Sequence, residues 1–258
     1  VATPALIFSS VAVSDTDAFF SPVILVIAVA TVLTMLIYWA ISAVWFKQDA
    51  AETMAGAASA SYYNSVNIGL PIATYVLGDP TYVIPALVLQ MAVLSPIVIA
   101  GLDRGASGFV KSVLSGLTAP VVVAAFAGFA VSAASWQVPE PVLAPLEILG
   151  GASIPLILMS FGASLTGEKV LQSHRLPTTT ATALKLIGMP AVAWVVAKLL
   201  HLGPEETYAA LILCALPTAQ NVYNYAATYR SGEVICRDTV FLTTFLALPA
   251  MLLIAGVF

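Results

Sequence analysis

Long apolar stretches with few charged residues are the feature that most constrains how this chain can fold. Of its 258 residues 60% are hydrophobic and 9% are charged, whereas a soluble domain of this size carries about 25% charged residues. This small number of charged residues cannot cover the surface of a soluble protein. Most of the protein's surface must therefore face lipid. In lipid each backbone polar group needs a partner within the protein, and helices provide one segment by segment. The sequence therefore predicts an all-α, polytopic membrane protein.

Nine apolar segments are separated by charged residues, glycines and prolines. A helix needs about 20 residues to cross the hydrocarbon core of a bilayer, and every segment except the first reaches that length. The connections are short, so we expect one membrane domain over residues 1–258. We expect the first segment to be the end of a helix that begins upstream. The predicted spans are 1–13, 18–46, 53–77, 81–102, 109–135, 141–166, 177–200, 206–229 and 234–258.

The charged residues between these segments fall into two sets that alternate along the chain. One set of connections holds seven of the nine basic residues, and the other holds acidic residues and no Lys or Arg. Because basic residues accumulate on the cytoplasmic side, we expect a multi-pass protein of the cell membrane with its C-terminus outside. The basic residues are Lys47, Arg104, Lys111, Lys169, Arg175, Arg230 and Arg237, and the acidic ones are Asp15, Asp17, Asp79, Glu140, Glu205 and Glu206.

Short motifs recur at a nearly constant distance, which indicates an internal repeat. The run Ala2–Ser9 resembles Ser153–Ser160, with prolines 151 residues apart, and Pro96 corresponds to Pro249, 153 residues later. Five helices lie within that distance, an odd number, so the second copy would insert upside down, as is common in secondary transporters. We expect five plus five helices, with the first helix and part of the second absent from this chain. The two repeats would cover residues 1–102 and 109–258.

Two predicted spans carry prolines and amides near their middle. Proline removes a backbone donor and disturbs the preceding turn, so it kinks or breaks a helix. Matching interruptions in two halves of a chain are typical of a transport site. Two interpretations stay open, because the amides either cap the broken backbone or bind a substrate; a half-helix N-terminus would then favour a carboxylate. The third span holds Asn64, Asn67 and Pro71, and the eighth holds Pro217, Gln220, Asn221 and Asn224.

The same segments resemble those of a known family. The patterns Asn-x-Gly-x-Pro from Asn67 to Pro71 and Pro-x-x-x-Asn from Pro217 to Asn221, with Pro-Ala-Leu-Ile-Phe from Pro4, are similar to the auxin efflux carrier family in its bacterial type. The similarity covers essentially the whole chain and starts inside the family's second helix. It implies a ten-helix fold with a scaffold and a transport domain, whose fourth and ninth helices cross at Pro71 and Pro217 beside the substrate. It also implies transport of a small organic anion, such as a mono- or dicarboxylate, and homodimers formed through the scaffold.

Lys185 lies near the middle of a predicted span, where a charge costs at least about 2.5–3.5 kcal/mol on insertion scales. It should therefore face a cavity or a partner, as counter-charge for an anionic substrate, as a group in a coupled proton step, or in an ion pair with a residue such as Glu147. The remaining alternative is that its side chain extends to a nearby membrane interface. Gln90 and Thr243 follow the two interrupted helices and either face the site or hydrogen-bond between helices. The predicted substrate-binding residues are Asn64, Asn67, Pro71, Pro217, Gln220, Asn221, Asn224 and Lys185.

Other classes of function lack their sequence signals. There is no nucleotide-binding Gly-x-x-x-x-Gly-Lys-Ser/Thr loop, no basic stripe for nucleic acid, and no embedded His or Asp pair for an enzyme. Cys214 and Cys236 fit neither a metal site nor a disulfide framework. We therefore expect no enzyme activity, no cofactor and no metal, and a secondary transporter that works by an elevator or rocking movement with possible coupling to protons or sodium.

Two alternatives stay open. The first is a sodium-coupled symporter of the bile-acid type, which the lack of an acidic residue near Pro71 and Pro217 disfavours. The second is a membrane sensor that binds a ligand with the same fold, although it would need an output domain that the sequence does not contain.

Overall fold

Helices account for nearly all of the regular structure. The computed structural model describes residues 2–13, 21–78, 82–103, 118, 120–152, 155–156, 159, 163 and 170–258. Within these ranges the β-type pairing is one isolated antiparallel bridge, between Tyr63 and Thr218. The all-α class predicted from the sequence is thus confirmed for the described part of the chain.

Three of the described helices are long and apolar enough to cross a membrane. In the first, α2 (Pro22–Ile41) continues into a π-helical turn, η2 (Ser42–Phe46). In the second, α11 (Arg175–Ala183), the π-helical turn η6 (Leu184–Gly188) and α12 (Met189–Leu199) form one rod. The third is α15 (Glu233–Ala255), which contains Pro249 without ending there.

Two further segments that the sequence predicts as spans are broken near their middle. The first consists of α3 (Ala50–Ser61), a non-helical stretch over residues 62–64, the π-helical turn η3 (Ser65–Gly69) and α4 (Leu70–Tyr75). The second consists of α13 (Pro204–Cys214), residues 215–219, and α14 (Gln220–Tyr229). These are the two segments in which the sequence predicted interruptions.

Each of the nine predicted spans contains helix in its described part. The helices not yet named complete the fold. They are α1 (Ala2–Ala12), α5 (Ile84–Leu89) continuing through η5 (Gln90–Leu94) into α6 (Ser95–Leu102), α8 (Pro120–Ala133) and α9 (Glu140–Gly151). The charged residues Asp15, Asp17, Asp79, Arg104, Lys111 and Lys169, and most of the run Ser153–Ser160, lie outside the described residues.

Three of the π-helical turns end two residues before a proline. Pro71, Pro96 and Pro190 each occupy the second position after the end of a π-helical turn, namely η3, η5 and η6. Proline lacks the N–H that closes an α-helical turn, and its ring collides with the carbonyl four residues earlier. A wider turn accommodates both defects, so the helix continues past the proline. The sequence predicted a kink or a break at Pro71, whereas the break lies at residues 62–64 and Pro71 lies within α4.

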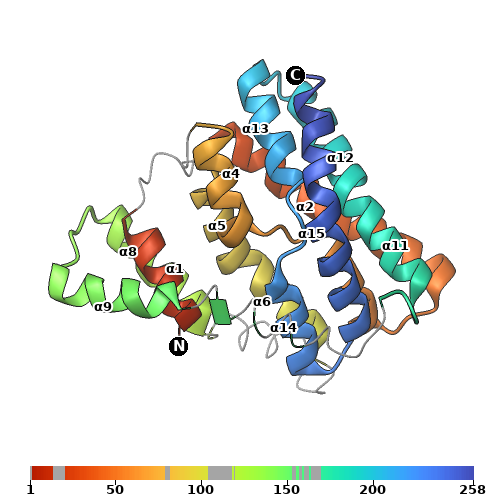
Figure 1. Cartoon of the computed structure of the whole chain (residues 1–258), viewed down its shortest axis with the longest axis horizontal. Coiled ribbons are helices and arrows are strands. Elements are labelled where there is room, and N and C mark those ends of the chain that lie inside the picture. The colour runs from red at the N-terminus through yellow and green to blue at the C-terminus, as the bar shows by residue number, and fades with distance from the viewer. Residues whose placement is uncertain are drawn as a thin grey trace.

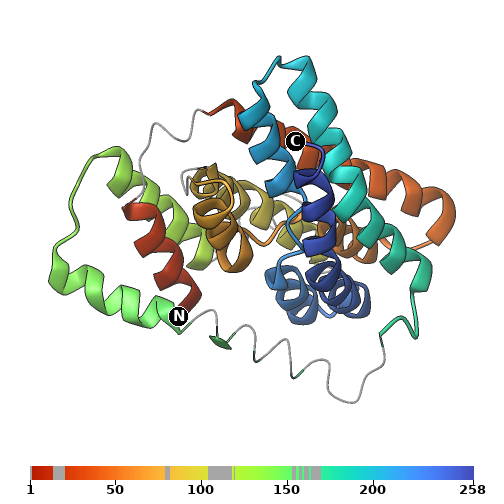
Figure 2. The ribbon, with the colours of Figure 1, turned by 45° about the horizontal axis from the view of Figure 1, so that its top comes forward.

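The described helices form two groups that share one apolar cluster where they meet. In one group α1 packs against both α8 and α9, and these three helices lie together at one edge of the molecule in Figures 1 and 2. In the other group α3 lies at the centre and contacts α2, α6, α11 and α15. The groups touch where α8 meets η5 and where α1 meets α5.

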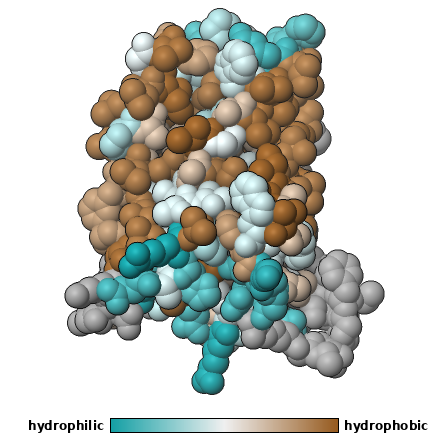
Figure 3. All heavy atoms as spheres, turned by 90° about the vertical axis from the view of Figure 1, so that its right-hand side faces the viewer, coloured by the Kyte–Doolittle hydropathy of each residue, from teal (hydrophilic) through white to brown (hydrophobic). Residues whose placement is uncertain are grey.

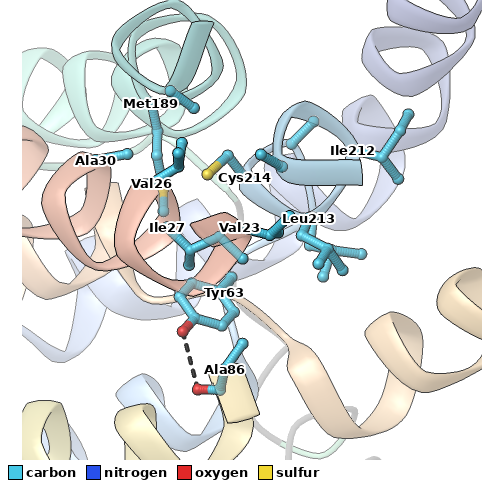
Figure 4. Packing of buried hydrophobic residues seen from close by; sticks show 14 of the residues in the cluster. Val23, Val26, Ile27, Ala30, Tyr63, Ala86, Met189, Ile212, Leu213 and Cys214 are labelled. Carbon is cyan, nitrogen blue, oxygen red and sulfur yellow. Dashed lines mark hydrogen bonds between the residues drawn. The ribbon is translucent and has the colours of Figure 1, made fainter. Parts of the chain in front are cut away.

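Small residues allow the close packing around α3. Every residue from Thr53 to Ser61 in this helix is buried, and most of these residues are Ala, Gly or Ser. A Cβ atom on Gly56 would lie 2.1 Å from the hydroxyl oxygen of Tyr38, so α2 approaches α3 at this point as only glycine permits. The larger apolar cluster lies between α2, α12 and α13, where Val26 and Ile27 face Met189 (Figure 4).

Apolar side chains cover the outer face of the larger group. On the side formed by α11, α12 and neighbouring helices they make a broad band, with hydrophilic residues gathered mainly at one end (Figure 3). A soluble protein rarely exposes so large an apolar area, whereas a bilayer covers it. At one end of α15, Arg230, Glu233 and Glu52 surround one hollow; at the other, the ring of Phe258 lies 6.2 Å from that of Tyr208. Which end faces the cytoplasm stays a prediction.

Candidate functional site

The two broken helices meet at their breaks. The backbone N–H of Asn64 donates to the carbonyl of Pro217 over 2.8 Å, and the N–H of Ala219 donates to the carbonyl of Tyr62 over 3.2 Å. These two bonds flank the isolated bridge and join segments about 150 residues apart in the sequence. Two interrupted helices therefore hold each other by a short piece of β-type pairing inside a helical protein.

We call the place where the two breaks meet, residues 62–64 and 215–219, the crossing. Side chains from neighbouring helices satisfy other backbone groups there. Gln90 donates its amide to the carbonyl of Tyr63, and the Thr243 hydroxyl accepts the N–H of Thr218 over 3.0 Å. The Thr218 hydroxyl in turn donates to the carbonyl of Ser59 over 2.6 Å. A buried backbone group without a partner would be costly, so these polar side chains make the breaks tolerable. The sequence left two roles open for Gln90 and Thr243. Both residues hydrogen-bond between helices, and Gln90 also lines the cavity described below.

Tyr63 fixes the position of the first break within the apolar core. Its ring lies below Val23 and Ile27 of α2 (Figure 4), and its hydroxyl donates to the carbonyl of Ala86 over 2.9 Å. The neighbouring Tyr62 hydroxyl shares a hydrogen bond with the hydroxyl of Ser95. Each tyrosine therefore ties the non-helical stretch to the helix that follows it, so the break has one defined geometry.

Three amide side chains converge next to the crossing. Asn64 and Asn67 both donate from Nδ2 to Oε1 of Gln220, over 2.9 and 3.1 Å. The backbone N–H of Asn67 donates to Oδ1 of Asn64 over 3.2 Å, which fixes the Asn64 side chain with its nitrogen toward Gln220. The facing atom of Gln220 must then be its oxygen. Two N–H donors thus point at one acceptor, which is an arrangement that a carboxylate oxygen can also accept.

A small cavity lies between these amides and α1. The space open to the centre of a water molecule is about 20 Å³, which is room for one or two waters and too little for an organic acid. Among the described residues that line it there is no Asp, Glu, Lys, Arg or His. They are Thr3, Leu6, Ile7, Tyr63, Asn64, Ser65, Asn67, Gln90, Met91, Ala219, Gln220 and Asn221.

The start of α14 gives the cavity its polarity. The N-cap residue Ala219 and the first two residues of this ten-residue helix, Gln220 and Asn221, all line the cavity. The first N–H groups of a helix have no partner within it, and the helix dipole places partial positive charge there. Together with the amide donors of Asn64 and Asn67, this end of α14 suits a small anion better than a cation.

Four of the predicted site residues lie around this cavity, namely Asn64, Asn67, Gln220 and Asn221. Pro217 lies in the crossing itself and supplies the carbonyl that Asn64 binds. The Asn64 amide fits the capping interpretation, because its Oδ1 accepts the backbone N–H of Asn67 over 3.2 Å, and the same side chain faces the cavity. Substrate binding by these amides stays a prediction.

The other three predicted residues lie elsewhere. Pro71 is exposed in α4, seven residues beyond Asn64, because the break forms at residues 62–64 and η3 absorbs the proline. Asn224 lies one turn further along α14 and is not among the lining residues. Lys185 also lies outside the cavity lining, with its Nζ 2.6 Å from the Cys214 carbonyl. The predicted ion pair with Glu147 does not form, since Glu147 is exposed on α9.

Sequence reasoning missed several residues of this site. Ser65 donates to Gln90, and Thr3, Leu6 and Ile7 bring α1 to the cavity wall. One signal could have found Ser65: it lies 25 residues before Gln90, as Thr218 lies 25 residues before Thr243. An alignment of the two proposed repeats at an offset of 153 would have paired them.

Comparison with known proteins now decides the family. A family model described as "membrane transport protein" matches residues 1–107 and 106–255. The chain belongs to this family, of the auxin efflux carrier type. This membrane transport protein is also similar to an uncharacterized transporter of Methanocaldococcus jannaschii, with 26% identity over 123 residues. That match covers 48% of the chain and 38% of its relative. The description of the family places the chain among membrane transport proteins.

Proposed function

We propose that this membrane transport protein is a secondary transporter of a small organic anion, such as a mono- or dicarboxylate. One observation carries the proposal: two amide donors, from Asn64 and Asn67, converge on a single acceptor oxygen at the N-terminal end of α14. A carboxylate that took the place of the Gln220 oxygen would receive both donors and the favourable helix dipole. Asn221 lies in the same lining and would complete the set of donors.

The proposal includes an inverted repeat with residues 1–102 and 109–258 as its halves. The pairs Ser65–Gln90 and Thr218–Thr243 support this division, because each joins the broken helix of one half to the helix that follows it. Both pairs are separated by 25 residues and are offset from each other by 153 residues, the same offset as that between Pro96 and Pro249. The ten-helix architecture remains part of the proposal.

Transport would proceed by movement of one helix group against the other. The cavity lies between α1, in the group with α8 and α9, and the crossing, in the larger group. Because about 20 Å³ cannot hold an organic acid, α1 and the crossing must separate before a substrate enters. An elevator or rocking movement between the groups would expose the site to each side in turn. By family resemblance, the group of α1, α8 and α9 would be the scaffold through which two copies form a homodimer.

Uptake by proteoliposomes tests the proposal. Labelled malate, malonate and indole-acetate are supplied with and without imposed proton or sodium gradients. Saturable uptake of one acid is the expected result, and the gradient that drives it identifies any coupled ion. A requirement for sodium would favour the symporter alternative, and tight binding without uptake would favour a sensor.

Two matched substitutions locate the site. Asn221→Ala removes an amide from the cavity, and Asn224→Ala removes the same group one turn further along α14, outside the lining. A hydrogen bond to a charged group contributes about 1.5–3 kcal/mol, so Asn221→Ala should lower uptake by about 10- to 150-fold. Asn224→Ala should stay within about twofold of the unmodified protein. Equal uptake by both variants would contradict the site assignment.

A further inference from the structure

A fully buried lysine lies beside the crossing without an acidic partner. Lys185 has no exposed surface and belongs to η6, in the middle of the long span from Arg175 to Leu199. Its Nζ lies 2.6 Å from the carbonyl oxygen of Cys214 and 3.3 Å from Sδ of Met189. Among the described residues no carboxylate contacts this ammonium. Both of its polar contacts are therefore neutral groups.

The position of the Cys214 carbonyl explains why a cation is favourable there. Cys214 is the last residue of α13, and the chain then leaves the helix for the crossing at Pro217. The last carbonyls of a helix have no partner within it, and the dipole gives this end partial negative charge. Inside a membrane that charge cannot be satisfied by bulk water. A cation at this point completes the broken helix.

Two other roles for Lys185 do not fit the geometry. A direct substrate ligand would line the cavity, but the cavity lies at the start of α14 and Lys185 binds the end of α13. A structural ion pair would need a carboxylate, and none of the described carboxylates reaches the ammonium. The Lys185 ammonium thus binds a backbone carbonyl at the end of α13, before the crossing. The proposed anion-binding groups lie at the start of α14, after it.

We propose that Lys185 is a built-in cation: its ammonium occupies the place at the end of α13 that a dissociable monovalent cation would otherwise fill. The lysine is a positioning residue, because it holds the half-helix at the crossing and does not touch the substrate. Its charge is tethered to η6 and cannot leave. Anion transport by this protein therefore needs no bound sodium ion. The statement about transport depends on the proposed function, whereas the cation site itself does not.

The test removes the tethered charge and supplies a free one. Lys185→Ala deletes four heavy atoms, the number in propylammonium, and so leaves a space of matching size beside the Cys214 carbonyl. Lys185→Met keeps most of the volume and removes the charge. Lys198→Ala, at an exposed position on the same rod, is the control for loss of a lysine. Each full-length variant is purified in N-methylglucamine chloride, and its Tm and its uptake of the transported acid are measured.

In the unmodified protein and in Lys198→Ala, sodium or propylammonium should change neither quantity. In Lys185→Ala, uptake should fall at least about tenfold and recover at least about fivefold when sodium or propylammonium is added. Its Tm should rise by about 3 °C or more as the cation saturates the site. Lys185→Met should lose uptake without recovery, because no space remains for a cation.

Several outcomes would overturn the proposal. They are full uptake by Lys185→Met without added cation, no response of Lys185→Ala to either cation in Tm, and a sodium requirement of the unmodified protein. If Lys185→Ala folds only when a cation is present during purification, the proposal is supported. If no acid is transported by any variant, the proposed function fails while the Tm measurements still decide the cation site.

Discussion

The hydrogen bond between Thr243 and the backbone of Thr218 provides a sharp test of the crossing. Thr243 is fully buried, and its hydroxyl accepts the N–H of Thr218 over 3.0 Å while donating to the carbonyl of Thr239 in its own helix. Valine has nearly the same shape and removes only the hydroxyl. Thr243→Val would leave a buried backbone N–H without its acceptor, which costs about 1–3 kcal/mol.

The adjacent Thr244 offers a matched control. Its hydroxyl donates to the carbonyl of Val240 within α15, as Thr243 bonds to Thr239, but it holds no backbone group of the crossing. Thr244→Val should change the free energy of unfolding by less than about 0.5 kcal/mol. The difference between the two variants therefore isolates the bond to Thr218.

The assay is thermal unfolding of the purified protein in detergent, followed by uptake in proteoliposomes. For a chain of this size 1 kcal/mol shifts Tm by about 2–4 °C, so Thr243→Val should lower Tm by about 2–12 °C and Thr244→Val by less than about 2 °C. Thr243→Val should also reduce uptake, because the crossing positions Gln220. Equal shifts of Tm in the two variants would refute the reasoning.

Three further predictions test other parts of the structure. Gly150→Ala should lower Tm, because the added Cβ would lie 2.7 Å from the α1 backbone. Gly151→Ala should leave Tm unchanged, because nothing lies within 4 Å of the added Cβ. Equal effects of the two variants would contradict the packing of α1 on α9. Gln220→Glu should lower anion uptake at least about tenfold, since the new carboxylate would occupy the donors of both Asn residues; unchanged uptake would argue against an anion. In intact cells a membrane-impermeant thiol reagent should label Val257→Cys and not Arg230→Cys, and the opposite pattern would reverse the proposed topology.

The composition of the chain was sufficient to predict the helical class, because the bilayer leaves few alternatives for a chain with so little charge. The positions of its prolines and amides were sufficient to predict which two segments are interrupted. The position of the first break could not be read from Pro71. A proline in the sequence shows that one backbone N–H is missing. Whether the helix breaks or widens there depends on which other groups can bind the backbone N–H and carbonyl groups that lose their helical partners. Here Asn64 finds the carbonyl of Pro217, while Pro71 is accommodated by η3.

The site was predictable to the extent that it is built from amides. Asn67 and Gln220 were recognisable as candidates, because amides near a helix break either cap freed backbone groups or bind a substrate, and both line the cavity. Lys185 was recognisable as an unusual charge, but its partner was not, since a backbone carbonyl such as that of Cys214 leaves no mark in a sequence. The contribution of α1 to the cavity wall depends on how the two helix groups meet, which no local pattern encodes.

The β-type pairing at the crossing also constrains how the protein is made. Asn64 and Pro217 are 153 residues apart, and at about 5–20 residues per second a ribosome needs roughly 8–30 s to supply the second after the first. During that time the non-helical stretch at Tyr62 and Asn64 has no partner strand in the bilayer, where unpaired backbone groups are costly. The early half must then wait at the insertion machinery, or in contact with a chaperone, until the late half arrives. A ribosome-bound nascent chain that stops before α13 should accordingly crosslink to such a factor through a probe at residue 63, and release it once α14 has been inserted.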